Sequence, residues 1–68
     1  MGKQTFTASL NYWVKRRGIS KTELGRRIEV TPITITRWLN GETMAGTEHL
    51  PPLAKALDVS IPEFFSKP

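Results

Sequence analysis

Apolar residues recur along this chain every three or four positions, which is the spacing of one face of an α-helix. The first such stripe lies within residues 10–14, and Phe6 stands just before it. Three basic residues and a glycine follow directly, an order that is typical of the last turn and the end of a helix. The sequence therefore predicts a first helix from about residue 7 or 8 to residue 17, preceded by a flexible segment over residues 1–6.

Two short helices follow between Ser20 and Gly41. The first opens with a capping box, in which Ser20 and, three residues later, Glu23 each bond a backbone N–H of the other. The second opens at Thr31, whose hydroxyl can cap it, and Pro32 suits the first helical position, where no backbone donor is needed. It ends at an Asn-Gly pair, a common signal for the end of a helix.

These two helices share a set of inward-facing apolar residues: Leu24, Ile28, Val30, Ile35 and Trp38. Gly25 lies beside this set, and a residue without a side chain lets the second helix cross at close range. Two helices joined by a tight turn, with a small residue at their contact, form the helix-turn-helix arrangement. Its use is to present the second helix to the major groove of DNA.

The rest of the chain predicts two more helices. After an irregular loop over residues 42–49, a fourth helix is predicted over residues 51–58, with its apolar residues facing inward. Ser60 and Glu63 form a second capping box that opens a short fifth helix. The pattern contains no strand, repeat or linker, so we expect an all-α fold: one compact five-helix domain over residues 1–68, with the helix-turn-helix at helices 2 and 3.

Together these features resemble the Cro and phage-repressor family of helix-turn-helix proteins, which is lambda repressor-like and of the XRE type. The resemblance covers about residues 10–65 and rests on Leu24, Gly25, Val30, Thr31, Ile35, Arg37, Trp38, Asn40 and Gly41, followed by Leu53, Ala54, Ala56, Leu57, Val59 and Ser60. It implies a sequence-specific regulator of transcription that reads operator half-sites in the major groove of double-stranded DNA with its third helix, about Pro32–Leu39.

Several positions depart from the pattern of the family. Glu29 stands in the turn where the family usually has glycine, so the backbone there either avoids positive φ or bears a modest cost. The glutamine that commonly binds phosphate at the start of the second helix is Lys21 here, and Pro32 replaces a polar reader. The arginine and glutamate that form a buried ion pair in many phage repressors are Val14 and Leu39. Replacing both partners together leaves no charge stranded in the core.

The outward face of the third helix supplies the candidate base readers. Arg37 can make a bidentate bond to guanine, Ile33 can touch a thymine methyl group, and Thr36 can bond either kind of base edge. Positions near the DNA backbone follow from the family resemblance. The complete predicted DNA-binding set is Lys21, Thr31, Pro32, Ile33, Thr34, Thr36, Arg37, Asn40 and Thr43.

The distribution of charge agrees with a polyanionic partner. Residues 1–41 hold eight Lys and Arg against two Glu, whereas residues 42–68 hold two Lys against four acids. One end of the molecule is therefore basic, and the other is left for protein contacts. Because a small soluble domain also covers its surface with Lys and Arg, the charge alone does not decide between these interpretations.

Composition argues against several other classes of protein. The 68 residues include no cysteine and a single histidine, His49, which leaves no disulfide, no thiolate metal site and no acid–base constellation for an enzyme. We therefore expect no catalytic residues, metal, cofactor or small-molecule ligand. The sequence has no apolar run of about 18 residues and no signal-peptide core, so we expect no membrane contact and a cytoplasmic protein, associated with the nucleoid through DNA.

Self-association is expected, because a chain of this size buries only roughly 60% of its unfolded surface and a single small module binds DNA weakly. We predict a homodimer, at least on DNA, through Val59, Ile61 and Phe65, with Phe64 closing the core. The alternative is a protein-interaction module on the same fold, such as an antitoxin or an anti-repressor. The sequence leaves open the operator, the sign of regulation and a phage, plasmid or chromosomal origin. Its initial Met1 favours a natural small regulator over an excised domain.

Overall fold

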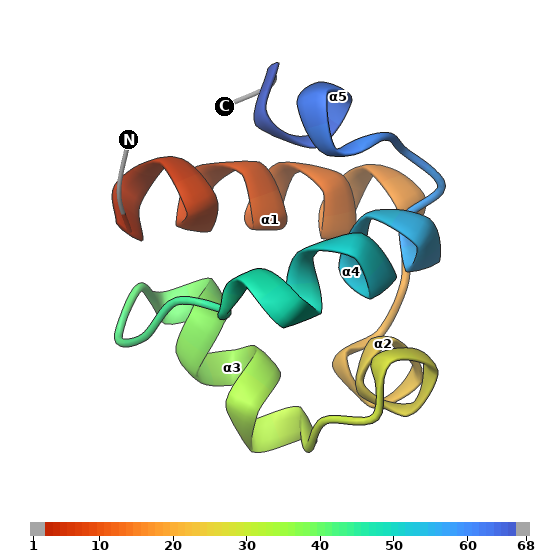
Figure 1. Cartoon of the computed structure of the whole chain (residues 1–68). Coiled ribbons are helices and arrows are strands. Elements are labelled where there is room, and N and C mark those ends of the chain that lie inside the picture. The colour runs from red at the N-terminus through yellow and green to blue at the C-terminus, as the bar shows by residue number, and fades with distance from the viewer. Residues whose placement is uncertain (1–2, 67–68) are drawn as a thin grey trace.

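The computed structural model describes residues 3–66 of the chain, and this part contains five α-helices and one 3-10 turn. In chain order these are α1 (Lys3–Arg17), α2 (Lys21–Ile28), α3 (Pro32–Asn40), η1 (Thr47–His49), α4 (Leu50–Ala56) and α5 (Ile61–Ser66) (Figure 1). No strand occurs among the described residues. The predicted all-α fold with five helices is thereby confirmed.

The helices surround one core in a body that measures 25 × 24 × 22 Å. α1 packs against α3 and α5, α2 packs against α3 and α4, and α4 also contacts α5. In Figure 1, α5 lies on one side of α1, and the α2–α3 pair lies at the opposite end of the molecule. The predicted helix-turn-helix is therefore supported from one side, by α1 and α4, and its other side faces outward.

Phe6 lies in the centre of the core rather than in a flexible segment. Its side chain has 0% exposed surface, and its ring centroid lies 6.0 Å from that of Trp38 and 6.0 Å from that of Phe64. α1 accordingly begins at Lys3, several residues before the predicted start, so the prediction of a flexible segment was wrong for residues 3–6. The first turn carries no acidic residue that would mark a helix start. Packing of the buried ring, and not a local signal, determines where this helix begins.

The other core side chains come from all five α-helices, from the loop after α3 and from the C-cap of α4: Leu10, Trp13, Leu24, Ile28, Ile35, Trp38, Ala45, Leu53, Leu57 and Phe64. Trp13, which the periodicity places inward, is 4% exposed, and its indole N–H donates to the carbonyl of Phe64 at 3.1 Å. This buried bond ties the short helix α5 to α1.

Two arginines from other helices bind the C-terminal end of α4. Arg17 donates to the carbonyls of Leu57 at 2.8 Å and of Asp58 at 3.3 Å. Arg27 donates to the carbonyl of Ala56 at 3.3 Å. The last carbonyls of a helix lack intrahelical donors, so these cations satisfy them and also suit the helix dipole. α4 ends at Ala56, earlier than predicted, and Asp58 reverses the chain with a φ of 61°.

The loop after α3 is more regular than the sequence indicated. Its Ala45 side chain is 4% exposed and therefore belongs to the core. Residues 47–49 form the 3-10 turn η1, which packs against α4. The prediction of an irregular loop was therefore wrong for these three residues, because a buried methyl group and the contact with α4 hold the segment in place.

Glu29 occupies the left-handed region of the backbone map, with φ 62° and ψ 44°. An L-residue in this conformation costs about 1–2 kcal/mol, and glycine avoids most of that cost. We therefore expect Glu29→Gly to raise the free energy of unfolding by about 1 kcal/mol and the Tm by roughly 4–8 °C, measured by circular dichroism. Glu29→Ala is the control, because it removes the same exposed side chain but keeps the Cβ atom. An equal rise in both variants would show that the backbone is not the cause.

Candidate nucleic-acid interface

The turn between α2 and α3 passes directly over Gly25. A Cβ atom on this residue would lie 2.5 Å from the carbonyl oxygen of Val30 and 3.6 Å from the backbone nitrogen of Pro32. The Val30 N–H also donates to the Gly25 carbonyl at 2.9 Å. No side chain fits at position 25 unless the backbone moves. The predicted need for a small residue at this position is confirmed. The close contact to Gly25 comes from the backbone of the turn.

Ser20 caps α2, since its Oγ accepts a hydrogen bond from the Glu23 N–H at 3.0 Å. The carboxylate of Glu23 does not complete the predicted capping box but accepts from the guanidinium groups of Arg26 and Arg27, the latter at 2.8 Å. These two bonds, first that of Arg26 and then that of Arg27, lower the pKa of Glu23. One carboxylate therefore offsets part of the positive charge of α2. Lys21, exposed in the first turn, makes no ion pair with a described acidic residue.

The N-terminal end of α3 is fixed by its own side chains. The Oγ1 of Thr31 accepts from the Thr34 N–H at 3.2 Å, and the two threonine hydroxyls lie 3.0 Å apart. Pro32 stands at the first helical position, as predicted. Thr31 and Pro32 are exposed, and Thr34 is half-buried. The start of α3 is therefore well defined and accessible to a partner.

α3 has one face in the core and another at the surface. Ile35 is 0% and Trp38 is 3% exposed. On the opposite face, Ile33 is 66% exposed, Arg37 is exposed and Thr36 is half-buried. Within the described part of the chain, no acidic side chain forms an ion pair with Arg37. The guanidinium group is thus available to a ligand outside the molecule.

A family model described as helix-turn-helix matches residues 10–64, which is most of the chain. The chain belongs to the helix-turn-helix family. The matched family is of the XRE type, lambda repressor- and Cro-like, and consists of DNA-binding regulators, which confirms the predicted resemblance. No curated protein and no solved structure matches the chain.

In this helix-turn-helix protein, α3 ends at Asn40 and is capped by Gly41, which has a φ of 78°. The Glu42 N–H then donates to the carbonyl of Arg37 at 3.0 Å, which closes the last turn. The side-chain amide of Asn40, a predicted phosphate contact, donates to the carboxylate of Glu42 at 3.3 Å. Thr43 is exposed in the loop that follows. Both predicted contacts are accessible, but Glu42 places a negative charge beside Asn40.

Most of the predicted DNA-binding residues lie on α3 or next to its ends. Eight of the nine lie in α3, at its N-cap or in the loop after it, and Lys21 lies at the start of α2. None of the nine is buried. Their contacts with DNA stay predictions.

Two α1 side chains that sequence reasoning missed contact the C-terminal end of α3. The Asn11 amide donates to the Leu39 carbonyl at 2.9 Å, and the Thr7 hydroxyl donates to the Trp38 carbonyl at 3.4 Å. The partners are 28 and 31 residues apart in sequence, and the chain gives no signal for either pair beyond polar residues beside an apolar stripe. Val14 and Leu39, the apolar pair that replaces an ion pair, are both half-buried against the core.

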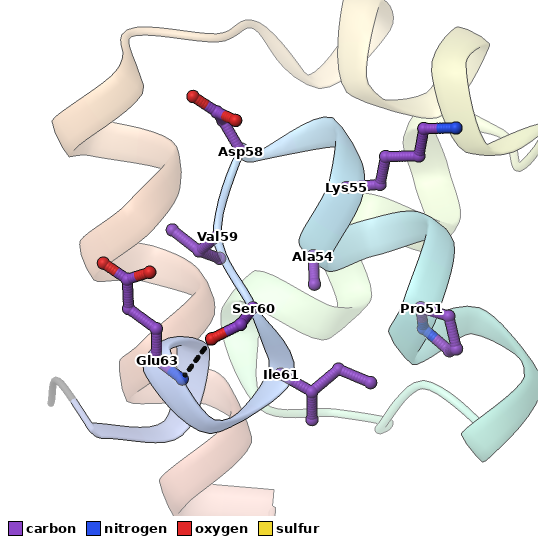
Figure 2. A pocket seen from close by; sticks show the side chains of 8 residues that line it. All are labelled: Pro51, Ala54, Lys55, Asp58, Val59, Ser60, Ile61 and Glu63. Atoms are coloured by element: carbon purple, nitrogen blue, oxygen red, sulfur yellow. Dashed lines mark hydrogen bonds between the residues drawn. The ribbon is translucent and has the colours of Figure 1, made fainter.

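Of the residues predicted to form a dimer, Val59 and Ile61 lie where α4 meets α5, and Phe65 lies farther along α5. Ile61 is 38% exposed, Val59 and Phe65 are half-buried, and Phe64, 2% exposed, closes the core as predicted. Figure 2 shows Val59 and Ile61 at a groove of about 530 Å³ that is lined by residues of α4, of α5 and of the segment between them. None of the residues that line the groove belongs to α3.

Residues 3–66 contain neither a candidate metal site nor a helix that could span a membrane. No group of three His, Cys, Asp or Glu residues there is arranged to hold a metal ion. His49 lies with its ring 5.6 Å from that of Trp38 and its Nε2 3.8 Å from the carboxylate of Glu48. None of the described helices is both long enough and apolar enough to cross a bilayer.

Proposed function

We propose that this protein is a sequence-specific regulator of transcription, Cro- or repressor-like, which reads operator half-sites in the major groove of double-stranded DNA with α3. The observation that carries the proposal is the outward face of α3, where Arg37 lies exposed and without an acidic partner among the described residues. Thr36 and Arg37 follow Ile33 by three and four positions, so each neighbours Ile33 on the surface of the helix. The opposite face of α3 is fixed in the core, so these side chains stand on a rigid support.

Each side chain on this face suits a particular base edge. The guanidinium fork of Arg37 matches O6 and N7 of guanine, a contact that contributes about 1–3 kcal/mol of discrimination. Ile33 matches the thymine methyl group, and the hydroxyl or methyl group of Thr36 can meet either kind of base. Pro32 offers no donor and no polar side chain. Direct readout is thus limited to few positions, which leaves a larger share of specificity to the shape of the DNA.

Contacts with the DNA backbone then set the register of α3 in the groove. We assign them to Lys21, Thr31, Thr34, Asn40 and Thr43, which flank the readers on the helix-turn-helix. The hydroxyls of Thr31 and Thr34 bond each other at 3.0 Å, which uses one of their two hydroxyl hydrogens. The other hydrogen is available to a phosphate oxygen. The ammonium group of Lys21 supplies a positive charge at the start of α2.

Operator recognition requires two copies of the chain. Successive major grooves on one face of B-DNA lie about 34 Å apart. The largest dimension of the described part of the molecule is 25 Å, so one copy cannot reach two half-sites. We propose a homodimer through Val59 and Ile61, at the groove between α4 and α5, and through Phe65 on α5. Such a regulator acts in the cytoplasm, on DNA of the nucleoid, by occupying a promoter against RNA polymerase.

The dimer can be tested at Ile61, the most exposed apolar side chain of the proposed surface. Ile61→Asp is expected to raise the dissociation constant of the dimer about tenfold or more, because it places an unpaired charge in an apolar contact. Sedimentation velocity without DNA measures this constant. Met44→Asp is the control, since Met44 is a comparably exposed apolar residue, at 45%, outside the proposed surface. Equal association of the parent and of Ile61→Asp would place the dimer contact elsewhere.

One observation favours a second candidate function. Ile33 is 66% exposed and follows an exposed proline, and exposed apolar residues at a helix start also suit a protein contact. In that case α3 would bind another protein, as in an antitoxin or an anti-repressor, and not DNA. The unpaired cation Arg37 beside Ile33 and the basic N-terminal half favour the DNA-binding function over this alternative.

Selection from a pool of random duplexes tests the proposal directly. The parent chain is expected to enrich a palindromic site, whose half-site spacing also reports the dimer geometry. Its affinity for that site should fall steeply as salt is raised, because bound phosphates release counterions. Binding without any preferred sequence would contradict the proposal and favour the protein-interaction module.

A further inference from the structure

Asn11 fixes the end of α3 to α1 through a pair of hydrogen bonds. Its side-chain amide donates to the carbonyl of Thr7, one turn earlier in α1, at 2.9 Å, and to the carbonyl of Leu39 in α3, also at 2.9 Å. An amide NH₂ group has two hydrogens, and both are used. The bond to Thr7 holds the side chain against its own helix, so the bond to Leu39 is made from a fixed position.

The Leu39 carbonyl is one that α3 cannot satisfy by itself. The last carbonyls of any helix lack an intrahelical donor. In α3, the carbonyl of Arg37 accepts from the N–H of Glu42, and that of Trp38 accepts from the N–H of Gly41. The next carbonyl, that of Leu39, accepts from Asn11 of another helix. The end of α3 is therefore completed by α1.

Thr7 strengthens the same contact one turn away on α1. Its hydroxyl donates to the Trp38 carbonyl at 3.4 Å. Its side chain also lies under Gly41, where a Cβ atom would be 3.5 Å from the Thr7 hydroxyl oxygen. Two adjacent turns of α1 thus contact the last turn of α3. Arg37 lies in this last turn and is exposed.

We propose that Asn11 is a positioning residue for base recognition, which holds the Leu39 carbonyl and thereby sets the orientation in which α3 presents Arg37 to the groove. This inference rests on the proposed DNA-binding function. Asn11 is exposed, and the hydrogen bonds that its side chain makes are the two to Thr7 and Leu39. A displacement of about 1 Å at a recognition element is enough to weaken a geometry-dependent contact such as a bidentate pair.

The first test needs no DNA. Amide hydrogen exchange at Gly41 and Glu42 reports how often the last turn of α3 opens. Asn11→Ala is expected to speed exchange at these amides about three- to tenfold, which is the loss of one hydrogen bond, while leaving the amides of α2 unchanged. Ala8→Gly is the control, because it weakens the same helix at an exposed position without touching the bonds of Asn11. Unchanged exchange in Asn11→Ala would overturn the inference, whether or not the protein binds DNA.

The second test is a double-mutant cycle on DNA. Asn11→Ala is expected to weaken binding to the enriched site about three- to tenfold at a temperature where the variant is fully folded. Affinity for a random duplex and the dependence on salt should stay the same, because Asn11 carries no charge and reads no phosphate in this scheme. In an Arg37→Ala background the effect of Asn11→Ala should largely disappear, because the two residues act through one contact.

The outcomes separate the two proposals. Equal losses from Asn11→Ala in both backgrounds, or an equal loss on random duplexes, would mean that Asn11 touches DNA itself, and the positioning role would be overturned. Ala8→Gly should bind the site as the parent does. If the parent enriches no sequence at all, the proposed function fails. The exchange measurement then still decides whether Asn11 orders the end of α3.

Discussion

Replacing Phe6 by alanine is expected to destabilise this protein by about 3–5 kcal/mol, the usual cost of removing a fully buried aromatic ring. Phe6 has 0% exposed surface and contacts the rings of Trp38 and Phe64, so its loss opens a cavity between α1, α3 and α5. Small domains have about 5 kcal/mol of stability or little more. Phe6→Ala should therefore be largely unfolded near 37 °C, which urea denaturation followed by tryptophan fluorescence will measure.

Phe6→Leu is the matched control for this experiment. It keeps an apolar side chain at the centre of the core, so a smaller cavity remains. Its free energy of unfolding is therefore expected to exceed that of Phe6→Ala by at least about 1 kcal/mol. If the free energy of unfolding of Phe6→Ala fell by less than about 0.5 kcal/mol, the change would be no larger than that of an ordinary surface substitution. Such a result would mean that the start of α1 is flexible in solution, as the sequence pattern predicted.

The start of α1 shows why the sequence could not give the whole fold. The apolar stripe of α1 is evident only from Leu10 onward, and Phe6 before it is followed by Thr7, a β-branched residue that is not a strong helix former. Helical structure there depends on Trp38 and Phe64, which are 32 and 58 residues farther along the chain. Contacts at such distances leave no trace in a local pattern.

The helix-turn-helix could be predicted because its signals are local. The caps of Ser20 and Thr31 each act on an N–H three residues away, and the small residue at position 25 contacts a turn five residues later. Each of these relations lies within a single turn or loop. For the same reason, the outward face of α3 follows from helical periodicity alone.

The hydrogen bonds that polar side chains make to distant parts of the chain could not be predicted from the sequence. Arg17 appeared suited only to the end of its own helix, yet it binds carbonyls of Leu57 and Asp58, about 40 residues later. Arg27 and Asn11 likewise reach carbonyls 29 and 28 residues away. Any donor can bond any carbonyl within reach, so the pairing depends on how the helices are packed. The support of α3 by Asn11, and of the end of α4 by Arg17 and Arg27, is therefore evident only in the structure.

Arg37→Ala is the substitution with the largest expected effect on function. Removing the guanidinium fork, which we propose to bond guanine, should reduce affinity for the enriched site roughly 5- to 150-fold per half-site and relax the preference at one base pair. Fluorescence anisotropy on the parent site and on each single-base variant measures both effects. Stability should change little, because the Arg37 side chain is exposed and its guanidinium makes no ion pair among the described residues. Lys15→Ala is the control, since it removes one exposed positive charge from the last turn of α1, outside both the predicted DNA-binding set and the groove between α4 and α5.

Arg37→Lys separates the geometry of the contact from its charge. Lysine keeps the positive charge but cannot form the planar pair of parallel bonds. If Arg37 reads guanine, this variant should keep its affinity for random duplexes and lose most of the preference at that base pair. If Arg37 binds a phosphate, Arg37→Ala should weaken all duplexes alike and lower the salt slope by about one, and Arg37→Lys should restore both. If neither substitution changes the affinity for any duplex, the outward face of α3, with Ile33 at its start, binds a protein instead of DNA.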